Sequence, residues 1–248
     1  MGGCAGRRCG ARMSDPGGRS PVVSAVVLAA GASTRMGRPK QLLPWGGVPM
    51  VRHVAETLAG STASEVIVVV GCRADEVTLA VLGGSEGDSG RKAPIRVAVN
   101  SAWEDGMAAS VACGVGAARA DAEAFLITLS DHPAVGVDVI DVLIAEFAQR
   151  SPAERARAVL VPVHEGRRGH PTLLSAGLRA ELEALGAART LRDIVNANAD
   201  PIRSLVEVSS DGIRMDLDTP SDYVEALLQM PRFASCIEEP EGSATDGN

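Results

Sequence analysis

Residues 26–43 read VVLAAGASTRMGRPKQLL, and this stretch decides the fold of the chain. It continues an apolar, β-branched run over residues 22–28, which predicts a buried parallel strand. The strand opens into a loop of small residues, 31–37, that carries the cation Arg35, and Lys40 follows. Small side chains let backbone N–H groups approach phosphate oxygens, while the two cations neutralise their charge. The stretch therefore predicts a strand that ends in a phosphate-binding loop.

The loop differs from two better-known phosphate loops. The dinucleotide fingerprint G-x-G-x-x-G is absent, because no glycine lies between Gly31 and Gly37. The Walker A motif requires Gly-Lys-Ser/Thr, whereas Gly37 is followed by Arg38 and Pro39. Neither a dinucleotide site nor a P-loop is predicted.

Composition limits the classes of function. The chain has 248 residues, of which 46% are hydrophobic and 2% aromatic, enough for one large α/β domain with an aliphatic core. A net charge of −7 argues against a nucleic-acid or anionic-membrane partner. No apolar run approaches about 20 residues, and five scattered cysteines indicate no disulfide framework. Because no apolar stretch precedes Val22, we expect no secretory signal. We expect a cytoplasmic protein.

Strand and helix patterns alternate between residues 21 and 230. Further strands are predicted at 65–70, 95–99, 124–129 and 158–163, and helices at 50–59, 74–82, 107–118 and around 139–147. The alternation predicts a single α/β domain with a mostly parallel sheet covered on both faces. We expect a disordered leader at 1–20, a flexible loop at 83–92 and a disordered acidic tail at 231–248.

Asp131 follows the predicted strand 124–129 directly, in the sequence Ser-Asp-His-Pro. At the carboxyl end of a strand in a doubly wound sheet, its side chain would point into the ligand crevice. Position alone leaves two interpretations open. Asp131 would be a ligand of Mg²⁺, which prefers carboxylate and phosphate oxygens, or the N-cap of the following helix.

Two more carboxylates, Asp216 and Asp218, precede a Thr-Pro-Ser-Asp sequence. Thr219 is a good N-cap, Pro220 suits the first helical position, and Asp222 closes a capping box, so helix initiation explains all three. It does not explain Asp216 and Asp218. Alternate positions in a short strand would place both on one face.

The sequence offers no activated nucleophile. Ser33, Ser110 and Ser130 lack a G-x-S-x-G elbow, and Cys72 and Cys113 lack an identifiable activating base. Direct displacement therefore suits these residues better than a covalent enzyme intermediate.

The loop resembles the LAAG-x-S-x-RMG-x-PK signature of the MobA-like NTP transferases, and within them the branch of the molybdenum cofactor cytidylyltransferases. The matching residues are Leu28, Ala29, Ala30, Gly31, Ser33, Arg35, Met36, Gly37, Pro39 and Lys40. The resemblance covers about residues 22–228. It implies a single Rossmann-like nucleotide-binding domain of the nucleotide-diphospho-sugar transferase type, with a mixed, mostly parallel sheet.

The resemblance also implies roles for individual residues. Lys40 and Arg35 are the implied catalytic residues, which hold a triphosphate while Lys40 stabilises the charge that develops in the transition state. Family members carry Asp-x-Pro and D-x-D-T-P-x-D segments whose carboxylates hold Mg²⁺, which assigns the metal to Asp131 and Asp218, with Asp216 a weaker candidate. The implied nucleotide contacts of the loop are Leu28, Ala29, Ala30, Gly31, Ser33 and Gly37.

Three further positions resemble parts of the family pattern. An N-x-x-W-x-x-G-M-x-x-S element implies nucleotide contacts at Asn100 and Ser110, although its Trp103 would equally anchor a loop. His132 stands where many relatives have Gln or Met, which leaves open whether it touches the nucleotide or packs. A Gly-His-Pro segment resembles the family's acceptor-docking segment, although a solvated cationic turn is the alternative; its residues are Gly169, His170 and Pro171.

The reaction implied by the resemblance is transfer of CMP, or another NMP, from an NTP to the phosphate of molybdopterin or its molybdenum-loaded form. Ala30 stands where GTP-using relatives tend to carry glycine, which favours CTP. Two alternatives remain. One is an NAD(P)H-dependent oxidoreductase like the nicotine blue oxidoreductases, which the missing fingerprint and scarce aromatics disfavour. The other is a non-catalytic nucleotide-binding factor that serves a molybdenum hydroxylase.

Overall fold

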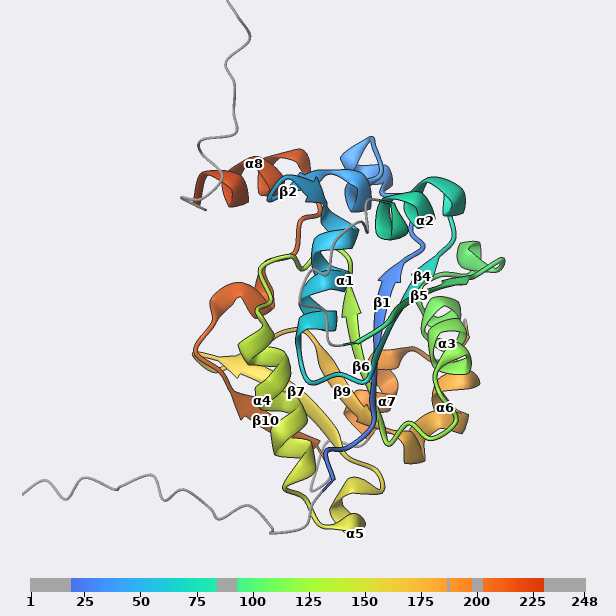
Figure 1. Cartoon of the computed structure of the whole chain (residues 1–248), viewed down its shortest axis with the longest axis vertical. Coiled ribbons are helices and arrows are strands. Elements are labelled where there is room, and N and C mark those ends of the chain that lie inside the picture. The colour runs from blue at the N-terminus through green and yellow to red at the C-terminus, as the bar shows by residue number, and fades with distance from the viewer. Residues whose placement is uncertain (1–18, 84–92, 187, 198–202, 230–248) are drawn as a thin grey trace, which may run out of the picture.

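A computed structural model of the chain describes residues 19–83, 93–186, 188–197 and 203–229. Most of the predicted leader, the loop 84–92 and the predicted acidic tail lie outside these ranges. A central twisted sheet runs through the described part, with helices packed on both of its faces (Figure 1).

The main sheet has eight strands in the described part of the chain, in the order β10-β7-β9-β6-β1-β4-β5, with β8 paired to β7. Pairing is parallel except that β9 runs antiparallel to β6 and β7, and β8 antiparallel to β7. The predicted mixed, mostly parallel α/β sheet is confirmed. The strands are β1 (Val23–Ala29), β4 (Glu65–Val70), β5 (Ile95–Val99), β6 (Ala124–Leu129), β7 (Val159–His164), β8 (Arg167–Arg168), β9 (Thr172–Ser175) and β10 (Arg203–Glu207).

The two faces of β1 contribute side chains to two separate hydrophobic cores. Val23, Ala25 and Val27 pack with α1, α2 and α4, whereas Val26 and Leu28 face α3, α6 and α7. Because both faces are covered, the strand is apolar at almost every position, as a buried parallel strand requires. The helices are α1 (Met50–Gly60), α2 (Ala74–Leu82), α3 (Met107–Ala117), α4 (Val137–Ala148), α5 (Pro152–Arg155), α6 (Arg179–Glu183), α7 (Leu191–Ala197) and α8 (Pro220–Gln229).

One predicted element is wrong. The short strand expected across Asp216 and Asp218 does not form: a 3-10 turn, Asp211–Arg214, is followed by irregular backbone. The backbone N–H of Leu217 donates to the carbonyl oxygen of Asp131 over 3.2 Å, which ties this segment to the residues that follow β6. The capping box of Thr219 and Asp222 is confirmed, with Asp222 accepting from the Thr219 N–H at 2.7 Å.

A third, smaller core brings α8 beside the loop that follows β1. It includes a hairpin that the sequence pattern did not predict, β2 (Pro44–Trp45) and β3 (Val48–Pro49). The hydroxyl of Tyr223 on α8 donates to the Pro44 carbonyl over 2.6 Å, and α8 lies against β2 in Figure 1. The other members of this cluster are Met36, Leu43, Trp45, Met50, Leu217 and Ala226. This packing carries the residues just before α8 toward residues 33–40.

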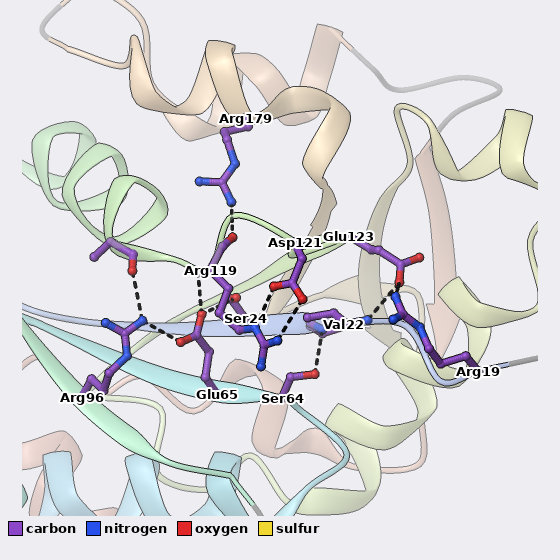
Figure 2. A network of polar contacts seen from close by, with 12 residues as sticks. Arg19, Val22, Ser24, Ser64, Glu65, Arg96, Arg119, Asp121, Glu123 and Arg179 are labelled. Atoms are coloured by element: carbon purple, nitrogen blue, oxygen red, sulfur yellow. Dashed lines mark hydrogen bonds and ion pairs between the residues drawn. The ribbon is translucent and has the colours of Figure 1, made fainter.

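The amino ends of the parallel strands are joined by a polar network (Figure 2). Glu65, the first residue of β4, accepts from the Ser24 hydroxyl at 2.7 Å and from the Arg119 N–H at 2.8 Å. Arg96 on β5 pairs with its other oxygen at 2.6 Å. The network therefore fixes the sheet at one end, while the opposite, carboxyl end is left to form the site.

Candidate active site

A cavity of about 400 Å³ lies at the carboxyl ends of β1 and β6. Ligands of open α/β sheets bind at this edge, and the volume lies within the range of small-molecule pockets. The strand end and the loop contribute Leu28, Ala29, Ala30, Gly31 and Ser33, all five predicted as nucleotide contacts. Arg35, Lys40, Ser110, Asp131 and Asp218 also line it, so the structure brings most of the predicted site residues together.

The loop after β1 is held by a buried residue that sequence reasoning missed, Gln41. Its Nε2 donates to the Gly31 carbonyl over 3.2 Å, and its Oε1 accepts from the Ser33 hydroxyl over 2.9 Å. Ser33 has a left-handed backbone, with φ of 54°, and its oxygen accepts from the Lys40 N–H at 3.1 Å. The Ser33 hydroxyl is thus engaged inside the loop. The sequence signal that could have indicated this role is the position of Gln41 directly after Lys40, at the start of an apolar run.

Gly37 closes the turn away from the cavity. Its φ of 69° is a conformation that favours glycine, and its N–H donates to the Thr34 carbonyl over 3.3 Å. It does not belong to the residues that line the cavity. A nucleotide contact at Gly37 stays a prediction.

Cations and carboxylates meet on one side of the cavity. The Lys40 ammonium donates to Asp131 Oδ2 and, over 2.9 Å, to Asp218 Oδ1. Arg35 pairs with Asp218 Oδ2 at 3.0 Å. Burial alone would lower the pKa of Lys40, but Asp131 and Asp218 together outweigh it and raise the pKa. The hydrogen bond from Lys40 lowers the pKa of Asp218, with help from the charge of Arg35.

Asp131 is not a helix cap, because α4 begins at Val137 with Gly136 as its N-cap. The Asp131 side chain is 7% exposed, and its Oδ1 has no hydrogen-bond partner within the described ranges. A buried carboxylate oxygen without a partner, next to an ammonium ion between two carboxylates, fits a site for a cation.

The described residues include no group of three or more His, Cys, Asp or Glu side chains placed to hold a metal. Mg²⁺ is usually held by one or two carboxylates together with substrate phosphates. Asp131 and Asp218 therefore fit a magnesium ion that brings phosphate ligands with it, and Asp216 also lines the cavity.

The segment after β5 forms the opposite wall. Trp103 and Gly106 line the cavity, and Trp103 packs on Gly71, where an added Cβ would lie 2.4 Å from the Trp103 Cβ. Trp103 is therefore both an anchor and a wall residue. Asn100 is buried behind the wall and donates to the Ser110 hydroxyl over 3.1 Å. Its direct nucleotide contact remains a prediction.

The Gly-His-Pro segment lies outside the cavity lining. Gly169 packs so closely on Ile213 that an added Cβ would lie 2.2 Å from the Ile213 carbonyl oxygen, and the His170 N–H donates to that oxygen over 2.8 Å. The ring of His170 also packs against that of His132, with centroids 4.7 Å apart and the ring planes tilted by 52°. The segment Gly169–His170–Pro171 thus packs against the residues next to Asp131 and against those that precede Asp216 and Asp218. A contact of this segment with the acceptor remains a prediction.

His132, for which the sequence leaves open a nucleotide contact or a packing role, is buried and packs in the structure. It is 5% exposed and does not line the cavity. Burial lowers the pKa of His132, and burial together with the neighbouring His132 lowers the pKa of His170 to about 4. Another histidine, His53 on α1, lies with Nε2 3.1 Å from the Pro133 carbonyl and so supports the same segment.

The sheet, the glycine-containing loop at its carboxyl edge and the facing cations and carboxylates define a nucleotide-binding α/β protein. Comparison with known families makes this specific: residues 25–202 match the MobA-like NTP transferase domain, and the chain belongs to that family.

Two curated relatives carry different names and are matched over different shares of their length. The chain is 34% identical over 160 residues to a nicotine blue oxidoreductase from Paenarthrobacter nicotinovorans, over 64% of this chain and 74% of the relative. It is 40% identical over 113 residues to a bifunctional protein GlmU from Sorangium cellulosum, over 45% of this chain but 23% of that protein.

Solved structures agree on the fold. The nucleotidyl transferase Mth528 from Methanothermobacter aligns with a TM-score of 0.65 and 25% identity, over 83% of this chain and 95% of that one. Rv0371c from Mycobacterium tuberculosis aligns with a TM-score of 0.64 and 24% identity, over 85% and 100% of the two chains. Among the described residues, we find no helix with the length and apolar character needed to span a membrane.

Proposed function

We propose that the chain transfers a nucleotidyl group from an NTP, CTP in the first instance, to a phosphate-bearing acceptor of the molybdopterin type and releases pyrophosphate. The observation that carries this proposal is the bridge of Lys40 between Asp131 and Asp218 at the wall of the glycine-loop cavity. The family membership and the solved nucleotidyl transferase Mth528 support the reaction class. The choice of CTP and of the acceptor rests on the resemblance of the loop to the cytidylyltransferase branch.

The chemistry needs no enzyme-bound intermediate. An oxygen of the acceptor phosphate attacks the α-phosphorus, a new P–O–P linkage forms, and the bond to the β-phosphate breaks with its electron pair on pyrophosphate. An anionic acceptor phosphate is its own nucleophile, so no strong general base is required. Lys40 and Arg35 would contact the phosphates and stabilise the charge that develops on them.

Asp131 and Asp218 would hold Mg²⁺, with the buried Asp131 Oδ1 as one ligand atom. When bound, the ion would neutralise phosphate charge and help to orient the triphosphate. The loop backbone at Gly31 has open space beside it, since an added Cβ there meets nothing within 4 Å, which leaves room for a phosphate oxygen.

The test is pyrophosphate release with Mg²⁺ and each of CTP, GTP, ATP and UTP, with and without molybdopterin. We expect acceptor-dependent release with one NTP, and Lys40→Ala and Asp131→Ala should each lower turnover by about a hundredfold or more while remaining folded. The matched control is Arg38→Ala, which removes an exposed cation from the same loop. Near-normal turnover in either folded site variant would refute the assignment.

A second candidate function is favoured by one observation, the similarity to nicotine blue oxidoreductase over most of that protein. In this alternative the cavity would bind a nucleotide cofactor for NAD(P)H-dependent reduction. Oxidation of NAD(P)H by the purified protein, with no pyrophosphate release from any of the four NTPs, would support it. Tight NTP binding without either activity would instead support an accessory factor for a molybdenum hydroxylase.

A further inference from the structure

Lys40 occupies the place of an ion between two carboxylates. Its ammonium group donates to Asp131 from the segment after β6 and to Asp218 from the segment before α8. The Lys40 side chain is 21% exposed and that of Asp131 is 7% exposed, so the charges face one another largely away from water. Hydrogen bonds between ionised groups in such a setting are about twice as strong as neutral ones.

The ammonium group nevertheless leaves the carboxylates incompletely satisfied. Asp131 Oδ1 remains buried and without a hydrogen-bond partner in the part of the chain that is described. A buried oxygen of this kind is costly unless something else binds it. A hard divalent cation prefers such oxygens, but it cannot occupy the same place as the Lys40 ammonium.

We propose that Lys40 occupies the divalent-cation position between Asp131 and Asp218 in the nucleotide-free protein and moves to the triphosphate when nucleotide and metal bind together. The inference rests on the proposed function, because it takes these two carboxylates as metal ligands. It makes Lys40 an internal competitor of the metal as well as a phosphate contact.

The exchange follows from which anion is available to the Lys40 ammonium before and after metal and nucleotide bind. If metal alone enters, Lys40 loses both carboxylates and its half-buried ammonium has no anion in exchange. A triphosphate supplies that anion, so metal and nucleotide each remove an obstacle to the other. Such coupling is reciprocal: each ligand must increase the affinity of the other by the same factor.

The decisive measurement is Mn²⁺ binding without nucleotide, followed through the loss of the free-ion electron paramagnetic resonance signal. Wild-type protein and Lys40→Met are compared, with Lys40→Gln as a second variant if the first does not fold. We expect Lys40→Met to bind Mn²⁺ at least about tenfold more tightly than wild type, since two charge-assisted hydrogen bonds no longer oppose the ion. Lys40→Met/Asp131→Asn should lose this gain.

The matched control is Arg38→Met, which removes a cation two positions away. Arg38 is exposed, and within the described residues it forms no ion pair, so long-range electrostatics alone would act on both variants alike. Equal gains in Lys40→Met and Arg38→Met, or no gain in the folded Lys40 variants, would overturn the exchange.

Pyrophosphate release by the same wild-type preparation separates the two hypotheses. If wild type releases pyrophosphate but Lys40→Met shows no increase in Mn²⁺ affinity, the proposed exchange is refuted and the proposed transferase function is unaffected. A gain that Asp131→Asn abolishes, in a protein that releases no pyrophosphate from any NTP, would support the exchange and refute the proposed reaction.

Discussion

Gln41 Nε2 donates a hydrogen bond of 3.2 Å to the carbonyl oxygen of Gly31, across the loop that follows β1. The same side chain accepts from the Ser33 hydroxyl, so a single buried amide fixes both ends of the loop's first turn. Because its donor and acceptor atoms are used in opposite directions, the amide is not interchangeable with a carboxylate.

Replacing Gln41 should weaken nucleotide binding without unfolding the protein. In Gln41→Glu a carboxylate oxygen would face the Gly31 carbonyl, and the resulting repulsion would displace the loop from the phosphates. We expect the dissociation constant for NTP, measured by calorimetry, to rise about tenfold, as for one lost hydrogen bond. Gln149→Glu, the same change on an exposed side chain at the end of α4, is the control and should bind as wild type does. Unchanged affinity in Gln41→Glu would show that the loop is held by other contacts.

The close approach of Gly169 to Ile213 predicts a large effect from a single methyl group. An alanine Cβ would lie 2.2 Å from the Ile213 carbonyl oxygen, so the backbone that leads to Asp218 must shift. We expect Gly169→Ala to destabilise the protein by about 2 kcal/mol or more, within the range of overpacking. Denaturant unfolding with Gly116→Ala as the control checks this, because an added Cβ at Gly116, in the last turn of α3, meets nothing within 4 Å. Similar stability of the two variants would contradict the close packing.

The regular elements were predictable because each is specified locally. The strands predicted at 65–70, 95–99 and 124–129 coincide with β4, β5 and β6, and the helix predicted at 74–82 with α2. Apolar period and β-branching suffice for these, since neighbouring residues in sequence form them. The loop motif likewise predicted most of the cavity lining, because consecutive residues after β1 make that wall.

The remaining features depend on contacts between distant residues. The antiparallel strand β9 is inserted between β6 and β7, and no local pattern states its direction. The segment with Asp216 and Asp218 is positioned by the Leu217–Asp131 bond and by α8 packing, not by strand pairing. The contact of His170 with the ring of His132, next to Asp131, could not be predicted either, because the two histidines are far apart in sequence.

The network at the amino ends of the strands predicts a contrast between two carboxylates drawn in Figure 2. Glu65, with a side chain 3% exposed, accepts from the Ser24 hydroxyl and from the Arg119 N–H, so Glu65→Ala would leave both donors without this acceptor. We expect a loss of about 3 kcal/mol in unfolding free energy. Asp121, which pairs with Arg119 at the surface, is 58% exposed, and Asp121→Ala should leave the stability unchanged within error. Chemical denaturation gives the unfolding free energy of both variants. Equal losses would mean that the buried hydrogen bonds of Glu65 stabilise the protein no more than the exposed ion pair of Asp121 does.

The burial of His170 predicts that the stability of the protein depends on pH in the range where histidines titrate. Burial, together with His132, lowers its pKa to about 4, against the opposing charge of Asp131, whereas an unfolded histidine titrates near 6.5. Between these values the unfolded chain binds a proton that the native protein does not, so stability must fall as pH falls through this window. The burial-lowered pKa values of His132 and His53 act in the same direction.

His170→Asn should therefore reduce the acid sensitivity of the protein. From the two pKa values, His170 accounts for roughly 2 kcal/mol of the stability lost between pH 7.5 and 5, and the variant should lose that much less over the same interval. The measurement is unfolding by denaturant at both pH values for wild type and variant, compared as the difference between pH values so that a general loss of packing cancels. His132 and His53 remain in the variant, so its stability should still decline toward pH 5, but less steeply. Parallel pH profiles for the two proteins would mean that His170 is protonated in the native state at pH 5 and that its burial against His132 does not exclude the proton.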